Sequence, residues 1–326
     1  MITQDEFIKK HNLKESDYYQ ENEWLYILNL KKNEFNKSVI KELPSKIEFT
    51  KNCDCDITIE EIEKISSDVI FNNKGEVKIY YTKEISENIV FNNNGNVEID
   101  YVKEISKNVI FNNNGNVEID YVEEILENVV FNNNGNLNLG SCEDPCLPIL
   151  KKIHSSVKFI NKIDIYLNNI IDRIPEGISF NNKGCISARF IKEISENVIF
   201  ENGEDLHLYE LEKIHPSVKF INGRNINFYC NTNKNKILKG LIFSNKGSIF
   251  ISRNVEYISD IIFNNDNNVR FGMINNGGNI KFGMKPVISQ IVHFNNKGFV
   301  ENKPFNVPKF LDPEKYLNKM IKQIYK

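Results

Sequence analysis

The chain has 326 residues, with 41 lysines and arginines against 44 aspartates and glutamates, and a formal net charge of −3. This balance argues against a general binder of nucleic acids or membrane surfaces, because such proteins need a surplus of positive charge. The sequence contains no run of about eighteen apolar residues, and residues 1–20 lack the apolar core of a secretory signal peptide. We therefore expect a cytoplasmic protein without a membrane span, whose six cysteines are reduced thiols.

Residues 1–38 lack the pattern that dominates the rest of the chain and are predicted to form an N-terminal helical cap or adapter. Thr3 and Glu6 have the spacing of a capping box, which favours a short helix from Gln4 to His11. One or two more helices are suggested by a second apolar pattern, which consists of Tyr18, Trp24, Leu25, Leu28 and Leu30. A cap is the expected role, because the end of a repeat structure presents open strand edges. The alternative is a small separate adapter or helix-turn-helix module, whose acidic composition argues against contact with DNA.

Residues 39–308 repeat a phrase of about twenty residues, such as ISENIVFNNNGNVEID at 85–100 and ISKNVIFNNNGNVEID at 105–120. The phenylalanine of this phrase recurs at Phe49, Phe71, Phe91, Phe111, Phe131, Phe159, Phe180, Phe200, Phe220, Phe243, Phe263 and Phe294. Ile274 is expected to take its place in one further, half-length unit, because INNGGNIKF copies the phrase. Such units cannot bury their apolar face alone and stack on one another, so the pattern predicts a mainly β repeat solenoid of about thirteen coils.

Each coil is predicted to contain two short strands, because its apolar residues alternate with other residues. One strand ends in the phenylalanine, and the other carries a V-x-I pair such as Val77 and Ile79. The asparagine two residues after the phenylalanine, such as Asn93, should point inward and satisfy backbone groups of its own coil and the next. The glycine four residues after the phenylalanine, such as Gly95, is predicted to supply the positive φ of a tight corner.

This frame of G-x-V-x-I followed by V-x-F-x-N resembles the short leucine-rich-repeat-like solenoids of bacterial and bacteriophage proteins, from about Leu43 to residue 305. It uses Ile, Val and Phe where the common consensus has Leu, and it shows no helical segment within a coil. Both a horseshoe and a straighter β-solenoid therefore stay open. The resemblance implies binding of a partner through a strand-lined face, and it implies no chemistry.

Residues 309–326 are predicted to form a C-terminal capping helix, because Asp312 and Pro313 fit the N-cap and the first helical position. This helix would carry an apolar face opposite Lys315, Lys319 and Lys322. A basic helix on a membrane surface is the alternative.

Residues that could carry chemistry do not converge in this arrangement. Cys53 and Cys55 lie four coils from Cys142 and Cys146, which is roughly 20 Å at a strand spacing of about 4.8 Å, so the four cannot share one zinc ion. The histidines are also dispersed, and no phosphate-loop, nucleophile-elbow or H-E-x-x-H motif occurs. We therefore expect no metal, no cofactor and no enzymatic activity.

A carbohydrate-active β-helix enzyme is the competing hypothesis, because such enzymes place carboxylates along a strand face. Its candidate residues are Glu98, Asp100, Glu118 and Asp120. They lie in two nearly identical copies of the repeat, and duplication explains them more simply than selection for an acid and a nucleophile.

Two rows of residues, seven and nine positions after the phenylalanine, are predicted to face outward and to form a partner-binding surface. They change from an acidic first half to aromatic and basic residues, and Tyr and Arg are enriched at protein–protein hot spots. The candidates are Glu98, Asp100, Glu118, Asp120, Tyr166, Arg189, Tyr209, Tyr229, Phe250, Arg253 and Arg270. A merely solvated face is the alternative.

The residue before each phenylalanine is also predicted to face outward. In the first coils it forms an apolar stripe of Ile70, Val90, Ile110 and Val130. Contiguous apolar stripes normally mark an interface, so we expect this one to join two copies or to meet a partner.

These features predict a non-catalytic solenoid that binds another protein. The abundance of Asn, Ile and Lys is typical of AT-rich coding and, with the resemblance, suggests a protein of a phage or other mobile element, acting in the host-cell cytoplasm. On that analogy, the hypothesis is an inhibitor that sterically blocks a host immune complex. The alternatives are the carbohydrate-active enzyme and a structural or assembly protein.

Overall fold

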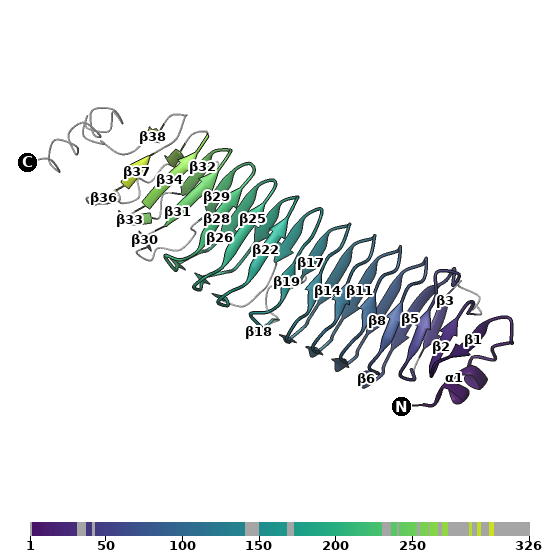
Figure 1. The fold of residues 1–326 in the computed structure, drawn as a ribbon. Helices are drawn as coiled ribbons and strands as arrows, with labels where there is room; N and C mark the ends of the chain where they lie inside the picture. Colours follow the sequence, from purple (N-terminus) through teal and green to yellow (C-terminus); the bar gives the residue numbers. More distant parts are fainter. Residues whose placement is uncertain are drawn as a thin grey trace, which may run out of the picture.

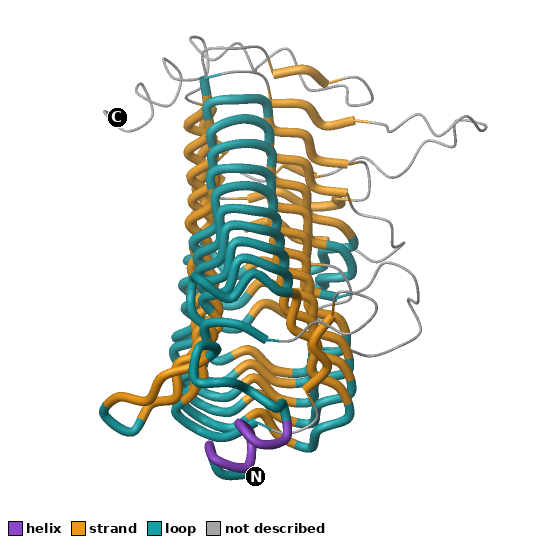
Figure 2. The backbone as a smooth tube through the Cα atoms, turned by 90° about the vertical axis from the view of Figure 1, so that its right-hand side faces the viewer, coloured by secondary structure: helices purple, strands orange, loops and turns teal. Residues whose placement is uncertain are grey.

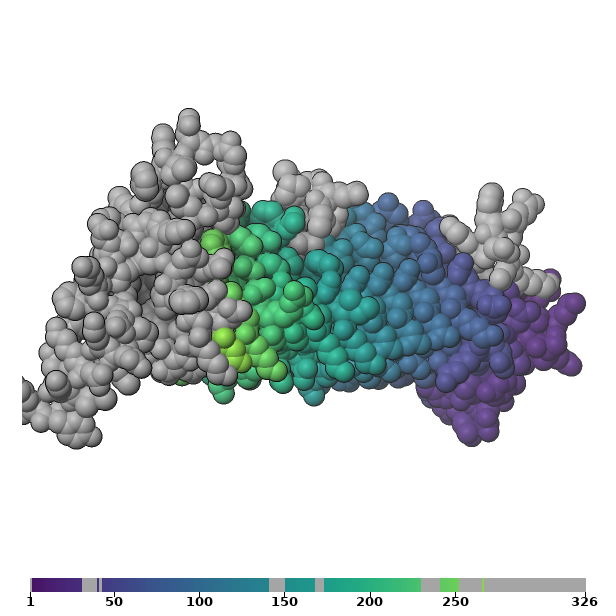
Figure 3. Space-filling view, turned by 90° about the horizontal axis from the view of Figure 1, so that it is seen from above, coloured from purple at the N-terminus to yellow at the C-terminus, as the bar shows by residue number. Residues whose placement is uncertain are grey.

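The computed structural model describes residues 2–30, 37–40, 43–140, 150–167, 173–229, 236–239, 241–252, 255–259, 261–266, 269–272, 287–288, 292–294 and 300–302. Short strands of successive coils stack side by side into an elongated β-solenoid (Figure 1). In the space-filling view, the colours follow one another in bands along the long axis, so the coils are stacked in sequence order (Figure 3). The predicted mainly β repeat solenoid is thereby confirmed.

Sheet A contains the phenylalanine strands and has 14 strands. All are parallel to their neighbours except β1, which is antiparallel to β2. In spatial order they are β1 (Tyr18–Glu21), β2 (Trp24–Ile27), β4 (Ile47–Phe49), β7 (Val69–Phe71), β10 (Val90–Phe91), β13 (Ile110–Phe111), β16 (Val130–Phe131), β19 (Lys158–Phe159), β22 (Ser179–Asn182), β25 (Ile199–Asn202), β28 (Lys219–Asn222), β31 (Ile242–Asn245), β34 (Ile261–Asn265) and β37 (Val292–Phe294).

Sheet B contains the V-x-I strands and has 13 strands. In spatial order they are β3 (Lys37–Ile40), β5 (Asp56–Glu60), β8 (Val77–Tyr80), β11 (Val97–Asp100), β14 (Val117–Asp120), β17 (Leu137–Leu139), β20 (Ile165–Leu167), β23 (Ile186–Ala188), β26 (Leu206–Tyr209), β29 (Ile226–Tyr229), β32 (Ile249–Ser252), β35 (Val269–Gly272) and β38 (Val300–Asn302).

A third side of each coil carries a further short strand, so the prediction of two strands per coil was wrong (Figure 2). The isoleucine six residues before the phenylalanine pairs with its equivalent in the next coil, as Ile85 does with Ile105. These strands, side C, are β6 (Lys64–Ile65), β9 (Glu84–Ile85), β12 (Glu104–Ile105), β15 (Glu124–Ile125), β18 (Lys152–Ile153), then β21 (Arg173–Ile174), β24 (Glu193–Ile194), β27 (Lys213–Ile214), and then β30 (Lys236–Lys239), β33 (Val255–Ser259), β36 (Val287–Ile288). Two residues are too short an apolar run to be recognised as a strand.

The core is a column of phenylalanine rings. From Phe49 to Phe243 each ring stacks on the next, with centroid distances between 4.8 and 5.5 Å. This matches the strand spacing of about 4.8 Å, so equivalent side chains meet face to face. Val, Ile and Leu of sheet B fill the opposite wall and are as fully buried as the rings.

The inward asparagine is buried in every described coil from Asn73 to Asn245, as predicted. In the first coils its side-chain amide donates hydrogen bonds to backbone carbonyls. Asn93 Nδ2 donates to the carbonyl of Gly95 (3.0 Å) and to that of Gly75 in the preceding coil (3.2 Å). From Asn182 onward the amides also bond one another, through Asn202 and Asn222 to Asn245, at 2.9–3.1 Å. The asparagines thus tie each coil to a neighbour.

A second polar ladder was not predicted. The Asn or Asp five residues after the phenylalanine accepts, through Oδ1, the backbone N–H of the next coil's equivalent residue. Asn96 accepts from Asn116, and Asn116 from Asn136, each at 2.9 Å. This bond satisfies a backbone donor at the corner between sheets A and B.

The glycine four residues after the phenylalanine lies at a corner, as predicted, but the predicted positive φ was wrong. The left-handed corners lie elsewhere, at residues such as Asn88 (φ 62°) and Tyr81 (φ 55°). Gly95 and its equivalents are instead packed against the preceding coil, where a Cβ atom on Gly95 would lie 2.5 Å from the Gly75 carbonyl oxygen. Close approach of two backbones is what requires glycine there.

The N-terminal segment is only partly helical. Helix α1 (Gln4–Lys10) forms with the predicted capping box and buries Phe7 in the core. The further helices expected over residues 18–30 were wrong, because β1 and β2 form a hairpin there. Its turn places Asn22 and Glu23 at positive φ, and β2 buries alternate residues and pairs with β4. The described helix is too short for a membrane span.

In sheet A, Phe263 of β34 pairs directly with Phe294 of β37. Ile274 itself, Cys142, Cys146 and the predicted C-terminal helix lie outside the described residues.

Candidate interaction surfaces

The described side chains among the predicted partner-binding residues lie on or directly after the strands of sheet B, on its outer face. Their alignment follows the strand register, in which Glu98 pairs with Glu118 and Asp100 with Asp120 between β11 and β14. Further along, Tyr209 of β26 pairs with Tyr229 of β29, and Phe250 of β32 with Arg270 of β35. The side chain of Arg270 and all of Arg253 lie outside the described residues.

The acidic end of this face is partly neutralised. Glu98 accepts hydrogen bonds from Lys78 Nζ (2.6 Å) and from the Tyr80 hydroxyl (2.7 Å). Burial, together with this hydrogen bond, raises the pKa of Tyr80 to about 12. Burial also raises the pKa of Asp100, whose Oδ1 has no hydrogen-bond partner among the described residues. The ion pair with Lys78 therefore offsets the charge of Glu98 at this end.

The aromatic end forms a continuous group that we call the aromatic cluster: Arg189, His207, Tyr209, Tyr229 and Phe250. The rings of Tyr209 and Tyr229 stack at 4.7 Å, and Phe250 lies 6.3 Å from Tyr229. The Arg189 guanidinium lies 5.8 Å from the Tyr209 ring. Burial lowers the pKa of His207, whose ring lies 6.1 Å from that of Tyr229. The cluster is a half-buried aromatic surface with one cation at its edge.

The two ends belong to one face but not to one site. Between β14 and β26 lie β17, β20 and β23, so the acidic and aromatic ends are roughly 19 Å apart at the strand spacing of about 4.8 Å. Tyr166 of β20 lies between them and donates its hydroxyl to Asp164 Oδ2 at 3.0 Å. Only a partner with an extended surface could contact both ends.

The predicted apolar stripe lies on a different side, the outer face of sheet A. Ile70, Val90, Ile110 and Val130 pair in register and are half-buried. Beside them runs a ladder of exposed or half-buried asparagine amides, in which Asn92 donates to Asn72 and Asn112 to Asn92, each at 3.2 Å. The role of the stripe as a dimer interface stays a prediction.

An exposed tyrosine stack was missed by the sequence reasoning. Tyr81, Tyr101 and Tyr121 occupy left-handed corners after β8, β11 and β14, with ring centroids 5.2 and 4.4 Å apart. Tyr81 is 62% exposed and Tyr101 45% exposed. The signal was present as a tyrosine ten residues after three successive phenylalanines, but tyrosine is an unusual residue at positive φ.

The described cysteines are Cys53, Cys55 and Cys185. Cys53 and Cys55 are buried with their Sγ atoms 2.9 Å apart. Across the described part of the chain, no three His, Cys, Asp or Glu side chains converge as metal ligands would.

No protein family, curated protein or solved structure matches the chain.

Proposed function

We propose that this protein is a non-catalytic solenoid that binds another protein through the outer face of sheet B. The aromatic cluster carries this proposal. Tyr and Arg supply a large contact area at a small cost in side-chain entropy, and they are enriched among the residues that dominate binding energy.

The rigidity of the scaffold supports the same proposal. The stacked phenylalanines and the asparagine ladders fix the spacing of successive coils, so the side chains of sheet B are presented in a preorganised array. A preorganised surface loses less entropy on binding, which favours affinity. Residues in these rows change in chemical type along the solenoid while the core positions stay apolar, so the face can differ from place to place without loss of the fold.

We further propose that binding blocks a host immune complex, with the chain encoded by a phage or mobile element. The abundance of Asn, Ile and Lys, which is typical of AT-rich coding, and the resemblance to short leucine-rich-repeat-like solenoids support this extension. Such an inhibitor needs no chemistry, because occupation of a surface is enough to exclude a substrate or a subunit.

The test compares two double variants as bait for proteins of the native host and then as purified ligands. Y209A/Y229A removes the stacked pair of the aromatic cluster, and Y81A/Y101A removes an equally stacked pair at the corners as a matched control. We expect one protein to be enriched by the wild type and the control, and its Kd to rise roughly thirtyfold with Y209A/Y229A, which corresponds to about 2 kcal/mol. Equal binding by Y209A/Y229A would overturn the proposal. So would turnover of a polysaccharide that is lost in E98Q/D100N.

A further inference from the structure

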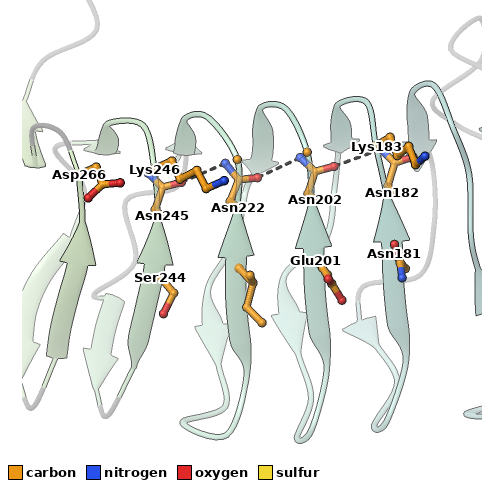
Figure 4. Close-up of a pocket in the computed structure, with 13 residues that line it drawn as sticks. Asn181, Asn182, Lys183, Glu201, Asn202, Asn222, Ser244, Asn245, Lys246 and Asp266 are labelled. Carbon is orange, nitrogen blue, oxygen red and sulfur yellow. Dashed lines mark hydrogen bonds between the residues drawn. The ribbon is translucent and has the colours of Figure 1, made fainter.

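A groove crosses the outer face of sheet A in the second half of the solenoid. It has a volume of about 590 Å³ and runs over β22, β25, β28 and β31 (Figure 4). The asparagines from Asn182 to Asn245 lie along one side of it, with their side chains buried. Glu201 and Ser244 lie on the strands below.

The groove has a local cause in the sequence. Three residues after the phenylalanine, the flanking coils have Lys183 and Lys246, whereas the two central coils have Gly203 and Gly223. In these two coils the glycine comes one residue earlier than in coils such as that of Gly95. The missing side chains leave the hollow, with a lysine at each end.

This part of the face is basic. Its outward positions on β19, β22, β25, β28 and β31, and directly after them, hold five exposed lysines: Lys158, Lys162, Lys183, Lys219 and Lys246. Glu201 is the acidic residue at these positions, and Asp266 adds a carboxylate at the far end of the groove. None of the five lysines has a carboxylate within ion-pair distance among the described residues.

Lysines on and near side C provide the contrast. Lys64 pairs with Glu84 at 2.5 Å, Lys83 with Glu63 at 2.7 Å, and Lys213 with Glu193 at 2.8 Å, each across neighbouring coils. The register that would allow such pairs also exists on sheet A, where Lys219 pairs with Ile199 and Ile242. The positive charge of this face is therefore not neutralised by ion pairs among the described residues.

Apolar side chains lie between the lysines. Ile221 is 47% exposed and lines the groove, and Ile242 is 50% exposed on the next strand. A ligand that covers this face must place carboxylates near the lysines and apolar groups on the isoleucines. Neighbouring strands set these positions about 4.8 Å apart.

We propose that this groove binds an acidic segment of another protein, whose carboxylates pair with the lysines and whose apolar side chains cover Ile221 and Ile242. A nucleic acid fits less well, because none of the outward positions listed for this face carries an aromatic ring on which a base could stack. Glu201 would also repel an uninterrupted polyanion. The chain's own C-terminal segment is rich in lysine, including Lys315, Lys319 and Lys322, so its charge opposes docking here.

The test uses a fluorescein-labelled peptide of alternating glutamate and leucine, titrated with the full chain at low and at moderate salt. We expect binding that weakens as salt screens the charges. The variant K183E/K219E/K246E should bind at least about tenfold more weakly. The matched control K64E/K83E/K213E makes the same change in net charge at lysines that already have partners, and it should bind within about twofold of the wild type.

Two further measurements separate the alternatives. I221N keeps every charge and should weaken binding of the peptide several-fold. Y209A/Y229A should leave the affinity for the peptide unchanged, which separates this groove from the aromatic cluster. Absence of binding at low salt, or equal binding by K183E/K219E/K246E, would overturn the proposal. So would equally tight binding of poly-glutamate or single-stranded DNA, because the face would then be a general anion surface. Folding of each variant is checked by circular dichroism.

Discussion

Glycine four residues after the phenylalanine is a packing requirement, and this can be tested at two glycines with opposite properties. A Cβ on Gly115 would lie 2.5 Å from the Gly95 carbonyl oxygen, although no positive φ is involved. Gly177 has φ +75°, but a Cβ there would have its nearest neighbour at 3.7 Å. We expect G115A to lower the free energy of unfolding by about 3 kcal/mol and G177A by about 1 kcal/mol. Urea denaturation measures both, and the reverse order would contradict the assignment.

For single residues, the sequence predicted where the repeated side chains lie better than why each residue type is needed there. The inward asparagine and the recurring phenylalanine could be placed from alternation alone, because strand side chains point to alternate faces. The reason for the glycine could not be found, because it depends on how closely two coils approach. Asn88, Asn108 and Asn128 lie at left-handed corners, and asparagine's tolerance of that conformation was a usable signal that went unused.

The inner asparagine ladder changes character along the solenoid, and its two halves should respond differently to the same substitution. Asn113 bonds only backbone carbonyls, including that of Gly115 at 2.9 Å. Asn202 also accepts from Asn182 and donates to Asn222. N202L therefore leaves Asn222 Oδ1 without its donor and removes one of the two bonds of Asn182 Nδ2, and we expect it to cost about 1–3 kcal/mol more than N113L. Chemical denaturation of the two variants measures the difference, and equal costs would show that the amide chain adds no stability.

The N-terminal hairpin shows why some elements could not be predicted. Tyr18, Leu25 and Leu28 have spacings that a helix face would also have, and only four residues of β2 alternate between half-buried and buried. The strand conformation is stabilised by a distant segment, because Leu25 and Ile27 of β2 pair with Ile47 and Phe49 of β4. The strands of side C were missed for a similar reason, since they are defined by their partners in adjacent coils rather than by their own two residues.

At the scale of the whole molecule, the candidate surfaces lie on two of the three long sides. The aromatic cluster lies on sheet B, while the apolar stripe and the basic groove lie on successive parts of sheet A. Sequence alone placed the rows but not the groove, which arises from a shift of Gly203 and Gly223 by one residue.

If the apolar stripe joins two copies, sedimentation should show a dimer whose dissociation constant rises at least about tenfold in V90E/I110E, because two carboxylates would be buried in the interface. A wild-type protein that stays monomeric at high concentration would exclude this role.

We expect the N-terminal segment to protect the first coil from pairing with other chains. Strand β1 runs antiparallel to β2 and ends the parallel ladder, while α1 covers the core with Phe7 and is held by the Gln4 side chain, which donates to the carbonyls of Glu23 and Lys46. Removal of residues 2–30 would expose the edge of β4 together with the end of the phenylalanine column. Open parallel edges with an apolar face pair readily, so we expect concentration-dependent self-association in sedimentation. Removal of residues 2–15 alone leaves the hairpin in place and should give a less stable monomer. A folded, monomeric chain lacking residues 2–30 would show that the hairpin is dispensable and that the first coil protects its own edge.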